Sequence, residues 1–381
     1  MAPLDPTTAD HFLSHLGAAQ TAVQAGVVPS RSTAADAHWL LWHTFCTSLA
    51  VDPLLSNIQV PTPFLQVFAH GYRTGEITPS GNQVRSRTVE DVLRSIGQTF
   101  LGLGQSDPRL TSQSRMDFRL QRQLASYTKA DPPPNRVKPI PISVIRHILA
   151  LASANADVSP DTIATADMIA LALFFLLRPG EYTGTRSDTT PFRMCDVCFY
   201  LGTRRLVTAT ATEGQILSAT YVTLEFTTQK NGVRGEVIGL GCSGSPTLCP
   251  IVALSRRVLH LRRNNAPLTT PLATFYNGRQ WKNVTPSAIT STLRHAVTFL
   301  GPTLGFLAKD VSARSLRASG AMALLCAKVD TDIIRLLGRW RSDEMLRYLH
   351  VQAEPIMRDF ARRMLNHGDF RLLPNQEVPT L

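Results

Sequence analysis

The chain has 381 residues, of which 44% are hydrophobic and 18% charged, and its formal net charge is +11. This length and composition predict a soluble globular protein of about two domains and exclude the disordered and fibrous classes. So large a positive surplus favours a polyanionic partner, nucleic acid or an anionic membrane.

We expect neither a membrane-spanning segment nor a signal peptide. No apolar run approaches the roughly 20 residues that span a bilayer, and the first ten residues do not have the pattern of a signal peptide. The six cysteines are scattered, which fits a reducing compartment. We therefore expect an intracellular protein, nuclear in a eukaryote and otherwise in the cytoplasm or nucleoid, without a membrane partner.

The first third of the chain divides into an arm and a helical domain. Residues 1–34 are small and of mixed polarity, and we expect a flexible N-terminal arm with one weak helix. In residues 35–130 apolar side chains recur at helical spacing, which predicts a helical domain. The side chains expected to face its core are Trp39, Trp42, Cys46, Phe64, Val67, Phe68, Val89, Val92, Leu93, Ile96, Phe100, Leu120, Leu124 and Tyr127.

Two local patterns in this domain make sharper predictions. Thr88-x-x-Asp91 resembles a capping box and predicts a helix that begins at Thr88. Arg115, Arg119 and Arg122 are spaced by four and three residues, which predicts one basic stripe on the next helix. A solvated surface and a DNA contact explain such a stripe about equally well, and the net charge favours DNA. The candidate DNA-binding residues are Arg85, Arg87, Arg94, Arg115, Arg119, Arg122, Arg136 and Lys138.

A proline-rich segment, residues 131–141, predicts an extended linker, since consecutive prolines prevent helix formation. Residues 142–368 then mix helical and strand patterns, which predicts an α+β domain with a small antiparallel sheet, and 369–381 form a tail. We expect helices at Ser143–Ala152, Asp161–Leu177, Cys249–Arg263, Pro286–Leu300, Val311–Ala327, Asp330–Leu337 and Ser342–Val351. We expect strands at Phe192–Tyr200, Arg205–Ala211, Tyr221–Thr228 and Val233–Leu240.

Charged residues at two places in this domain suggest chemistry. Arg178 follows an almost uninterrupted apolar helix, so it must be paired or face a cleft, and Glu181 could pair with it or orient it. Asn231-Gly232 predicts a type I′ hairpin turn. Lys230 precedes this turn on the strand face of Val222, Leu224 and Phe226, so it either reaches a cleft or extends to solvent.

The cysteines raise the question of a zinc site. Cys195-x-x-Cys198 could combine with Cys242 and Cys249, but the second pair is seven residues apart. Cys195 and Cys198 would also point to opposite faces of a strand. The spacing argues against zinc, and we expect core cysteines instead.

The C-terminal region contains the most specific pattern. Arg314-x-x-Arg317 places two guanidinium groups on one helical face, and Gly338-Arg339-Trp340 and Tyr348 follow. Two arginines and a phenol suit the attack of a tyrosine oxygen on a phosphodiester. Together with Arg178, Glu181 and Lys230, these residues occur in the order found in the tyrosine recombinase (phage-integrase-like) family, which the chain resembles over residues 136–365. Residues 177–182 and 338–343 further resemble recombinases of eukaryotic mobile elements.

This resemblance implies a role for each residue. Tyr348 would attack the scissile phosphate and form a 3′-phosphotyrosyl link. Arg178 and Arg317 would stabilise charge on the non-bridging oxygens, and Lys230 would protonate the leaving 5′-oxygen. Glu181 would order Arg178. The resemblance implies neither cofactor nor metal, because the guanidinium groups take the cation's role, and it implies tetramers on double-stranded DNA.

Two positions depart from the family pattern. Arg314 stands where the family usually has histidine and, because it stays protonated, it cannot accept the proton of Tyr348. The family's His/Trp position could be Arg339 or Trp340, and we favour Trp340, which would pack or donate its indole N–H.

Three functions therefore remain open. The first is a site-specific recombinase or integrase that clamps duplex DNA between its two domains. The second is a degenerate relative that binds DNA without cutting it, and the third is a topoisomerase-like enzyme of the same chemistry.

Overall fold

The computed structural model describes residues 6–26, 29–133, 137–154, 157–184, 191–227, 235–301 and 304–340. The chain divides into two compact units, Met1–Pro134 and Asn135–Leu381, and the division falls inside the proline-rich segment 131–141. None of the helices in the described ranges combines the length and hydropathy that a membrane crossing requires.

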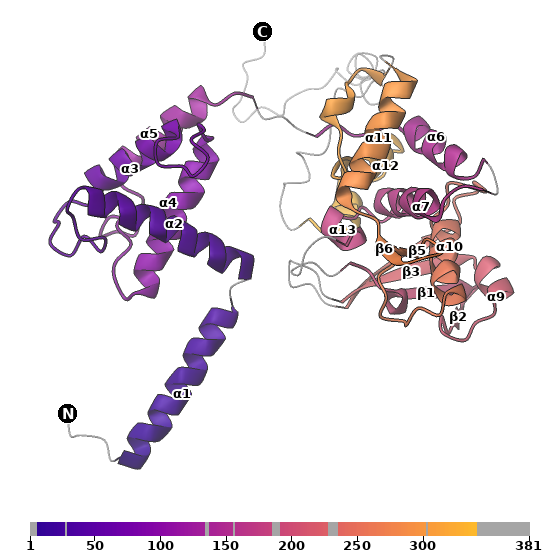
Figure 1. The fold of residues 1–381 in the computed structure, drawn as a ribbon, viewed down its shortest axis with the longest axis horizontal. Helices are drawn as coiled ribbons and strands as arrows, with labels where there is room; N and C mark the ends of the chain where they lie inside the picture. Colours follow the sequence, from indigo (N-terminus) through magenta and orange to yellow (C-terminus); the bar gives the residue numbers. More distant parts are fainter. Residues whose placement is uncertain are drawn as a thin grey trace, which may run out of the picture. The chain divides into compact units, whose positions relative to one another are not determined.

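The first unit is helical (Figure 1). Two helices occupy much of the segment predicted as an arm, and the mobility of that segment stays a prediction. Trp42, Cys46 and Phe68 are fully buried in one apolar cluster, which confirms the inward face predicted for these helices. The helices of this unit are α1 (Pro6–Ala25), α2 (Pro29–Ser48), α3 (Thr62–Thr74), α4 (Ser86–Gly102) and α5 (Phe118–Ala130).

Three local predictions in this unit are wrong. Val67 is 59% exposed, since its position on α3 lies outside the buried stripe. Helix α4 begins at Ser86 instead of Thr88, because the carboxylate of Asp131 accepts hydrogen bonds from the backbone N–H and hydroxyl of Ser86. Arg115 precedes α5, whose start is fixed by Asp117 as N-cap, so the basic stripe on that helix loses its first member.

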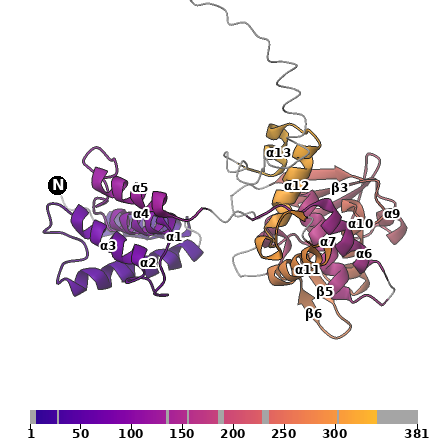
Figure 2. The ribbon, with the colours of Figure 1, turned by 90° about the horizontal axis from the view of Figure 1, so that it is seen from above.

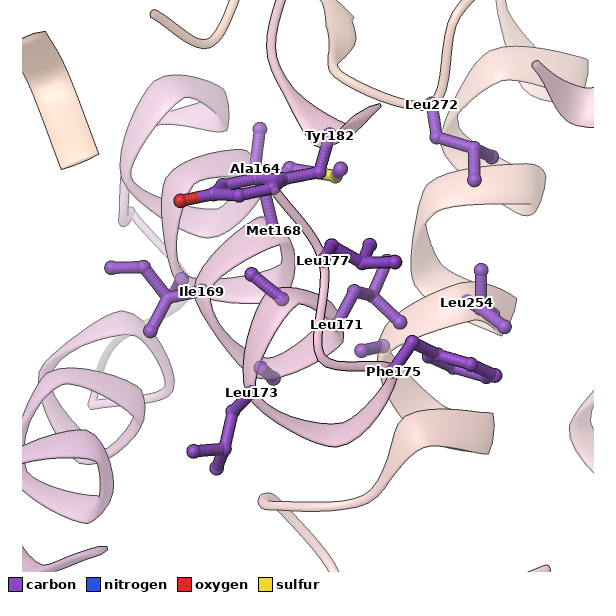
Figure 3. Packing of buried hydrophobic residues seen from close by; sticks show 14 of the residues in the cluster. Ala164, Met168, Ile169, Leu171, Leu173, Phe175, Leu177, Tyr182, Leu254 and Leu272 are labelled. Atoms are coloured by element: carbon purple, nitrogen blue, oxygen red, sulfur yellow. The ribbon is translucent and has the colours of Figure 1, made fainter. Parts of the chain in front are cut away.

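The second unit surrounds one apolar helix, α7 (Pro160–Phe174), which contacts α6, α10, α11 and α12 (Figures 1 and 2). Figure 3 shows Met168, Ile169 and Leu171 of α7 packed among apolar neighbours that include Leu254 of α10. The other helical elements are α6 (Ile142–Ala152), α8 (Pro179–Tyr182), η1 (Met194–Asp196), α9 (Glu213–Leu217), α10 (Pro250–Arg263), α11 (Pro286–Leu300), η3 (Ala308–Asp310), α12 (Ser315–Cys326) and α13 (Thr331–Leu337).

The unit contains a four-stranded antiparallel sheet in the order β2-β1-β3-β4 and a two-stranded sheet, β5-β6. Val222, Leu224 and Phe226 are at most 1% exposed, which confirms the inward face predicted for β3. A mainly helical chain with a small antiparallel sheet is the fold class expected from the sequence. The strands are β1 (Val197–Leu201), β2 (Arg204–Leu206), β3 (Tyr221–Phe226), β4 (Glu236–Gly241), β5 (Thr274–Tyr276) and β6 (Trp281–Asn283).

Several predicted boundaries in this unit shift. The 3-10 turn η1 replaces the start of the strand predicted at Phe192–Tyr200, and β2 is shorter than the predicted Arg205–Ala211. Helix α12 begins at Ser315, after a turn that the prediction at Val311–Ala327 had included. The helix predicted at Ser342–Val351 lies outside the described residues.

Candidate functional site

The structure describes most of the residues proposed for catalysis. Arg178, Glu181, Arg314, Arg317 and Trp340 lie in the second unit within the described ranges. The proposed acid Lys230, the proposed nucleophile Tyr348 and the candidate DNA contact Arg136 lie outside the described residues.

The C-terminal end of α7 is where the arginines meet. The helix ends at Phe174, and Leu176 has a left-handed backbone (φ 50°), which redirects the chain toward Arg178. The carbonyl oxygen of Leu176 accepts a hydrogen bond from Nη1 of Arg317 at 2.8 Å and another from Nη2 of Arg339 at 3.2 Å. Cations are favoured there, because the last carbonyls of a helix lack intrahelical donors and carry its negative dipole end.

Glu181 joins two of these arginines. Its Oε1 accepts from Nη1 of Arg178 at 3.0 Å, and its Oε2 accepts from the backbone N–H of Arg178 at 2.8 Å and from Nη2 of Arg339 at 3.1 Å. The side chain of Glu181 is 9% exposed and that of Arg178 is 34% exposed. Glu181 is therefore a nearly buried bridge, and Arg178 is the accessible cation beside it.

The position of Arg339 in this cluster was not predicted from the sequence. It appeared there only as the alternative to Trp340 at one family position, whereas the structure places it beside Glu181. Its guanidinium also lies 4.0 Å from the ring centroid of Phe226, and its Nε is buried without a hydrogen-bond partner among the described residues. Burial lowers the pKa of Arg339, and the charge of Glu181 opposes this effect.

Trp340 packs on Arg317. The Arg317 guanidinium lies 4.2 Å from the Trp340 ring centroid and donates to the carbonyl oxygen of Gly338. Trp340 belongs to a small buried cluster with Leu176 and Ile334. A Cβ atom at Gly338 would lie 1.6 Å from the Trp340 ring, so only glycine permits this packing. These contacts describe how the Trp340 ring packs, and its role toward a phosphate stays a prediction.

Arg314 does not share these contacts. It occupies the N-cap position of α12, where its backbone N–H donates to the Ser312 hydroxyl at 3.3 Å, and its side chain is exposed. No hydrogen bond or ion pair links that side chain to another residue in the described ranges. The structure thus brings Arg178, Arg317 and Arg339 together and leaves Arg314 on the surface.

Acidic groups offset part of the charge of this arginine cluster. Glu181 pairs with Arg178 and Arg339, and the charge of Glu236 also acts on Arg339. Arg178 keeps the most accessible guanidinium group of these pairs, and planar guanidinium groups match phosphate oxygens.

The candidate DNA-binding arginines of the first unit fall into two groups. Carboxylates in the same unit pair with Arg87, Arg94 and Arg119 at 3.8, 2.7 and 3.0 Å. Arg122 instead lies over the ring of Phe118 at 4.9 Å, and no acidic partner is found for it among the described residues. Arg85 and Arg115 of this unit, and Lys138 of the second unit, are also exposed without an acidic partner in the described part of the chain.

The cysteines correct the expectation of a uniformly buried set. Cys198 and Cys249 are buried, whereas Cys195 and Cys242 are exposed, because the first lies in η1 before β1 and the second follows the end of β4. No cluster of three metal-ligating side chains occurs among the described residues.

Comparisons with known proteins find similar solved structures but no relative by sequence. No family model and no curated protein matches the chain. A structure of the Tn1549 transposon integrase in complex with transposon right end DNA is 13% identical, covers 87% of this chain and 99% of its own, and gives a TM-score of 0.47.

Other solved structures resemble the chain more loosely. XerA recombinase is 11% identical, with a TM-score of 0.36, and the match covers 96% of this chain and all of that one. A lambda integrase dimer bound to a core site is 10% identical, with a TM-score of 0.42 and coverages of 92% and 83%. These similar structures are of integrases and a recombinase, and at this low similarity the chemistry must be judged from the residues themselves.

Proposed function

We propose that the chain is a site-specific DNA recombinase or integrase that cuts and rejoins DNA through a 3′-phosphotyrosyl intermediate. The observation that carries this proposal is the convergence of Arg178, Arg317 and Arg339 at the end of α7, where Glu181 pairs with Arg178 and Arg339 and the Leu176 carbonyl accepts from Arg317 and Arg339. Arg178 lies more than a hundred residues before Arg317 and Arg339 in the sequence, and the fold brings the three guanidinium groups together as a group that can hold a phosphodiester.

The accessible member acts on the phosphate. Arg178 is the most exposed of the three guanidinium groups, and its backbone and side chain are both held by Glu181. In this proposal Arg178 binds a non-bridging oxygen and stabilises the charge that develops in the pentacoordinate transition state. Glu181 fixes the orientation of Arg178 before DNA arrives, so that no reorganisation is needed during the reaction.

The remaining cations act around it. Arg317 supports the same phosphate while its own position is fixed by the Leu176 carbonyl and the Trp340 ring. Arg339 ties the segment that leads toward Tyr348 to Glu181, and so to Arg178. Arg314 is a phosphate contact and not a base, because a guanidinium group stays protonated.

The chemical step conserves bond energy. The Tyr348 phenol releases its proton to water and its oxygen forms a bond to phosphorus, the bond from phosphorus to the 5′-oxygen breaks, and Lys230 gives its proton to the departing oxygen. Attack by the free 5′-hydroxyl reverses the step and rejoins a strand without an external energy source. Cations of the protein carry the electrostatic stabilisation, so we expect cleavage to continue in excess chelator.

The test is capture of the covalent intermediate. Duplexes that the full-length protein selects from a random pool are rebuilt with a nick beside the cleavage position, so that the short leaving strand diffuses away. Wild type should then accumulate a denaturant-resistant protein–DNA adduct, and Tyr348→Phe should bind the same duplex equally well without forming one. Tyr276→Phe, in β5, is the matched control and should form the adduct normally. An adduct with Tyr348→Phe would contradict the assigned nucleophile.

A second function is favoured by one observation. Arg317 is 3% exposed and donates to two backbone carbonyls, which also suits a guanidinium retained to hold the fold together. With arginine at position 314, this supports a relative that binds DNA without cutting it. Wild-type protein that binds a selected duplex tightly and forms no adduct on any nicked form of it would favour this alternative.

Two further parts of the proposal concern assembly. The exposed basic residues of the first unit bind DNA flanking the cleavage position, while the second unit supplies the chemistry. Protomers associate on DNA as a tetramer, which light scattering of the complex with its selected duplex would measure directly.

A further inference from the structure

A pair of cysteines outside the arginine cluster lies within reach of each other. The Sγ atoms of Cys242 and Cys249 are 3.9 Å apart. Cys242 directly follows β4 and is exposed, whereas Cys249 is the N-cap residue of α10 and is fully buried. Neither thiol has a part in the phosphodiester chemistry.

The loop between the two cysteines is closed by its own hydrogen bonds. The Ser243 hydroxyl donates to the Leu248 carbonyl at 2.6 Å and accepts from the Ser245 backbone N–H at 3.2 Å. The Ser245 hydroxyl in turn accepts from the Leu248 backbone N–H at 3.1 Å. These bonds hold both ends of the loop together, so the proximity of the sulfurs is built into the fold.

The surroundings of Cys249 favour its thiolate. Burial alone would raise its pKa, but backbone N–H groups of Ser243, Val252 and Ile251 stabilise the charged sulfur, and the pKa of Cys249 is lowered overall. A cysteine at a helix N-terminus commonly behaves in this way, because the unpaired N–H groups and the helix dipole stabilise negative charge.

We propose that Cys242 and Cys249 form a reversible thiol–disulfide site that reacts with oxidised low-molecular-weight disulfides of the glutathione type. The exposed Cys242 reacts first: its thiolate attacks one sulfur of the small disulfide, forms a mixed disulfide and releases one small thiolate. The Cys249 thiolate then attacks Sγ of Cys242 and releases the second. In total one small disulfide is reduced to two thiols, and two protein thiols are oxidised to one disulfide.

The bond would connect two parts of the second unit. It joins the end of β4 to the start of α10, and α10 contacts α7, β3 and β4. A reducing compartment keeps such a pair as two thiols, and oxidising conditions close it, which is the behaviour of redox-sensing cysteines inside cells. This inference stands apart from the proposed DNA chemistry.

The test uses full-length protein equilibrated in buffers of graded reduced and oxidised glutathione. Free thiols are alkylated, the protein is digested with trypsin, and the peptides are weighed. Residues 235–256 form one tryptic peptide that contains Cys242 and Cys249 and no other cysteine. On oxidation we expect this peptide to lose both alkyl groups together and to weigh two hydrogen atoms less than the dithiol.

The chain carries its own matched control. Residues 194–204 form a tryptic peptide with Cys195 and Cys198, the pair whose C-x-x-C spacing looks more like a redox motif. Cys198 is buried and its Sγ accepts from Nη2 of Arg205 at 2.9 Å, and no contact joins the two sulfurs among the described residues. This peptide should form no internal disulfide in buffers that close the first pair.

Two variants test the order of attack. With Cys249→Ser the mixed disulfide on Cys242 has no resolving thiol, so glutathione should stay attached to residues 235–256. With Cys242→Ser the buried Cys249 should remain alkylatable only after unfolding and should carry no glutathione. The inference is overturned if wild type keeps glutathione on Cys242, if both thiols stay free in fully oxidised buffer, or if the disulfide joins two chains.

Discussion

Arg339 and Glu181 form an ion pair between residues 158 positions apart, with Nη2 and Oε2 separated by 3.1 Å. Both side chains are less than 10% exposed, and Glu181 also holds the more accessible Arg178. This one carboxylate therefore links the segment just before the undescribed C-terminal region to the start of α8.

Removing the charge of Glu181 should destabilise the second unit. Glu181→Gln leaves Arg339 buried without its counter-ion, and breaking a buried pair typically costs about 3–5 kcal/mol. Because the amide retains an acceptor and Arg178 is partly exposed, we expect the lower end, about 3 kcal/mol, in urea unfolding. Glu213→Gln removes the carboxylate of an exposed pair with Arg263 and should cost less than about 1 kcal/mol. Equal losses for the two variants would argue against the bridge.

Gly338 should tolerate no side chain. A methyl group there would overlap the Trp340 ring, and forced repacking of a dense core costs about 1–3 kcal/mol. We expect Gly338→Ala to lower the free energy of unfolding by that amount and to weaken DNA cleavage, because Arg317 packs on the same ring. Gly214→Ala in α9, where a methyl group meets nothing within 4 Å, is the control and should be neutral or slightly stabilising.

Asp167 predicts a pH dependence of stability. Burial raises its pKa to about 6, against the opposing effect of its bonds to Arg256. Because the folded-state pKa lies above the ordinary value of 3.8, the native state binds the proton more tightly than the unfolded state does. Protonated Asp167 therefore contributes fully to the free energy of unfolding below about pH 4. This contribution, about 3 kcal/mol, is lost as the pH rises to about 6.

The measurement compares unfolding free energies between pH 4 and pH 7. Asp167→Asn should remove this part of the pH dependence, so the difference between variant and wild type should change across the window. Asp157→Asn, at an exposed position, should follow the wild-type curve in parallel. A constant difference for Asp167→Asn would show that Arg256 keeps the carboxylate charged throughout.

The unpaired arginines should dominate the salt dependence of DNA binding. Each phosphate contact contributes about 0.9 to the slope of log binding constant against log salt. Arg122 lacks an acidic partner in the described region, so Arg122→Ala should lower the slope by about 1. Arg94 is already paired with Glu90 and Asp91, so Arg94→Ala should change the slope of the salt dependence far less. A wild-type affinity that is flat with salt would contradict DNA as the partner.

Periodicity made the buried faces predictable, because it reflects local geometry. Val89, Val92, Leu93, Ile96 and Phe100 recur at helical spacing and are all at most 2% exposed. Helix starts were harder to predict. The start of α4 depends on Asp131, a partner 45 positions away, which a capping motif at Thr88 cannot reveal.

The parts of the candidate site that could be predicted are the contacts between residues close in the sequence. Arg178 and Glu181 are three residues apart, and their pairing was one of two outcomes that the sequence allowed. The place of Arg339 was not readable, because it depends on the turn at Leu176 and on a carboxylate from another segment. The available signal was the position of Arg339 between Gly338 and Trp340. If Trp340 is buried, the adjacent Arg339 is expected to lie near the core and to need an acidic partner there.

The acceptor shared by Arg317 and Arg339 is a peptide carbonyl, that of Leu176. A missense change at position 176 replaces the leucine side chain but leaves the main-chain carbonyl oxygen in place. Most such changes therefore keep the acceptor that Arg317 and Arg339 share. What selection can act on is the left-handed backbone conformation at φ 50°. Branched residues and proline fit that conformation poorly, whereas asparagine and glycine accept it. The amino acids that can replace Leu176 should therefore be those that fit this backbone conformation and the volume of the core. With any of them, Arg317 and Arg339 keep the same carbonyl as a shared acceptor.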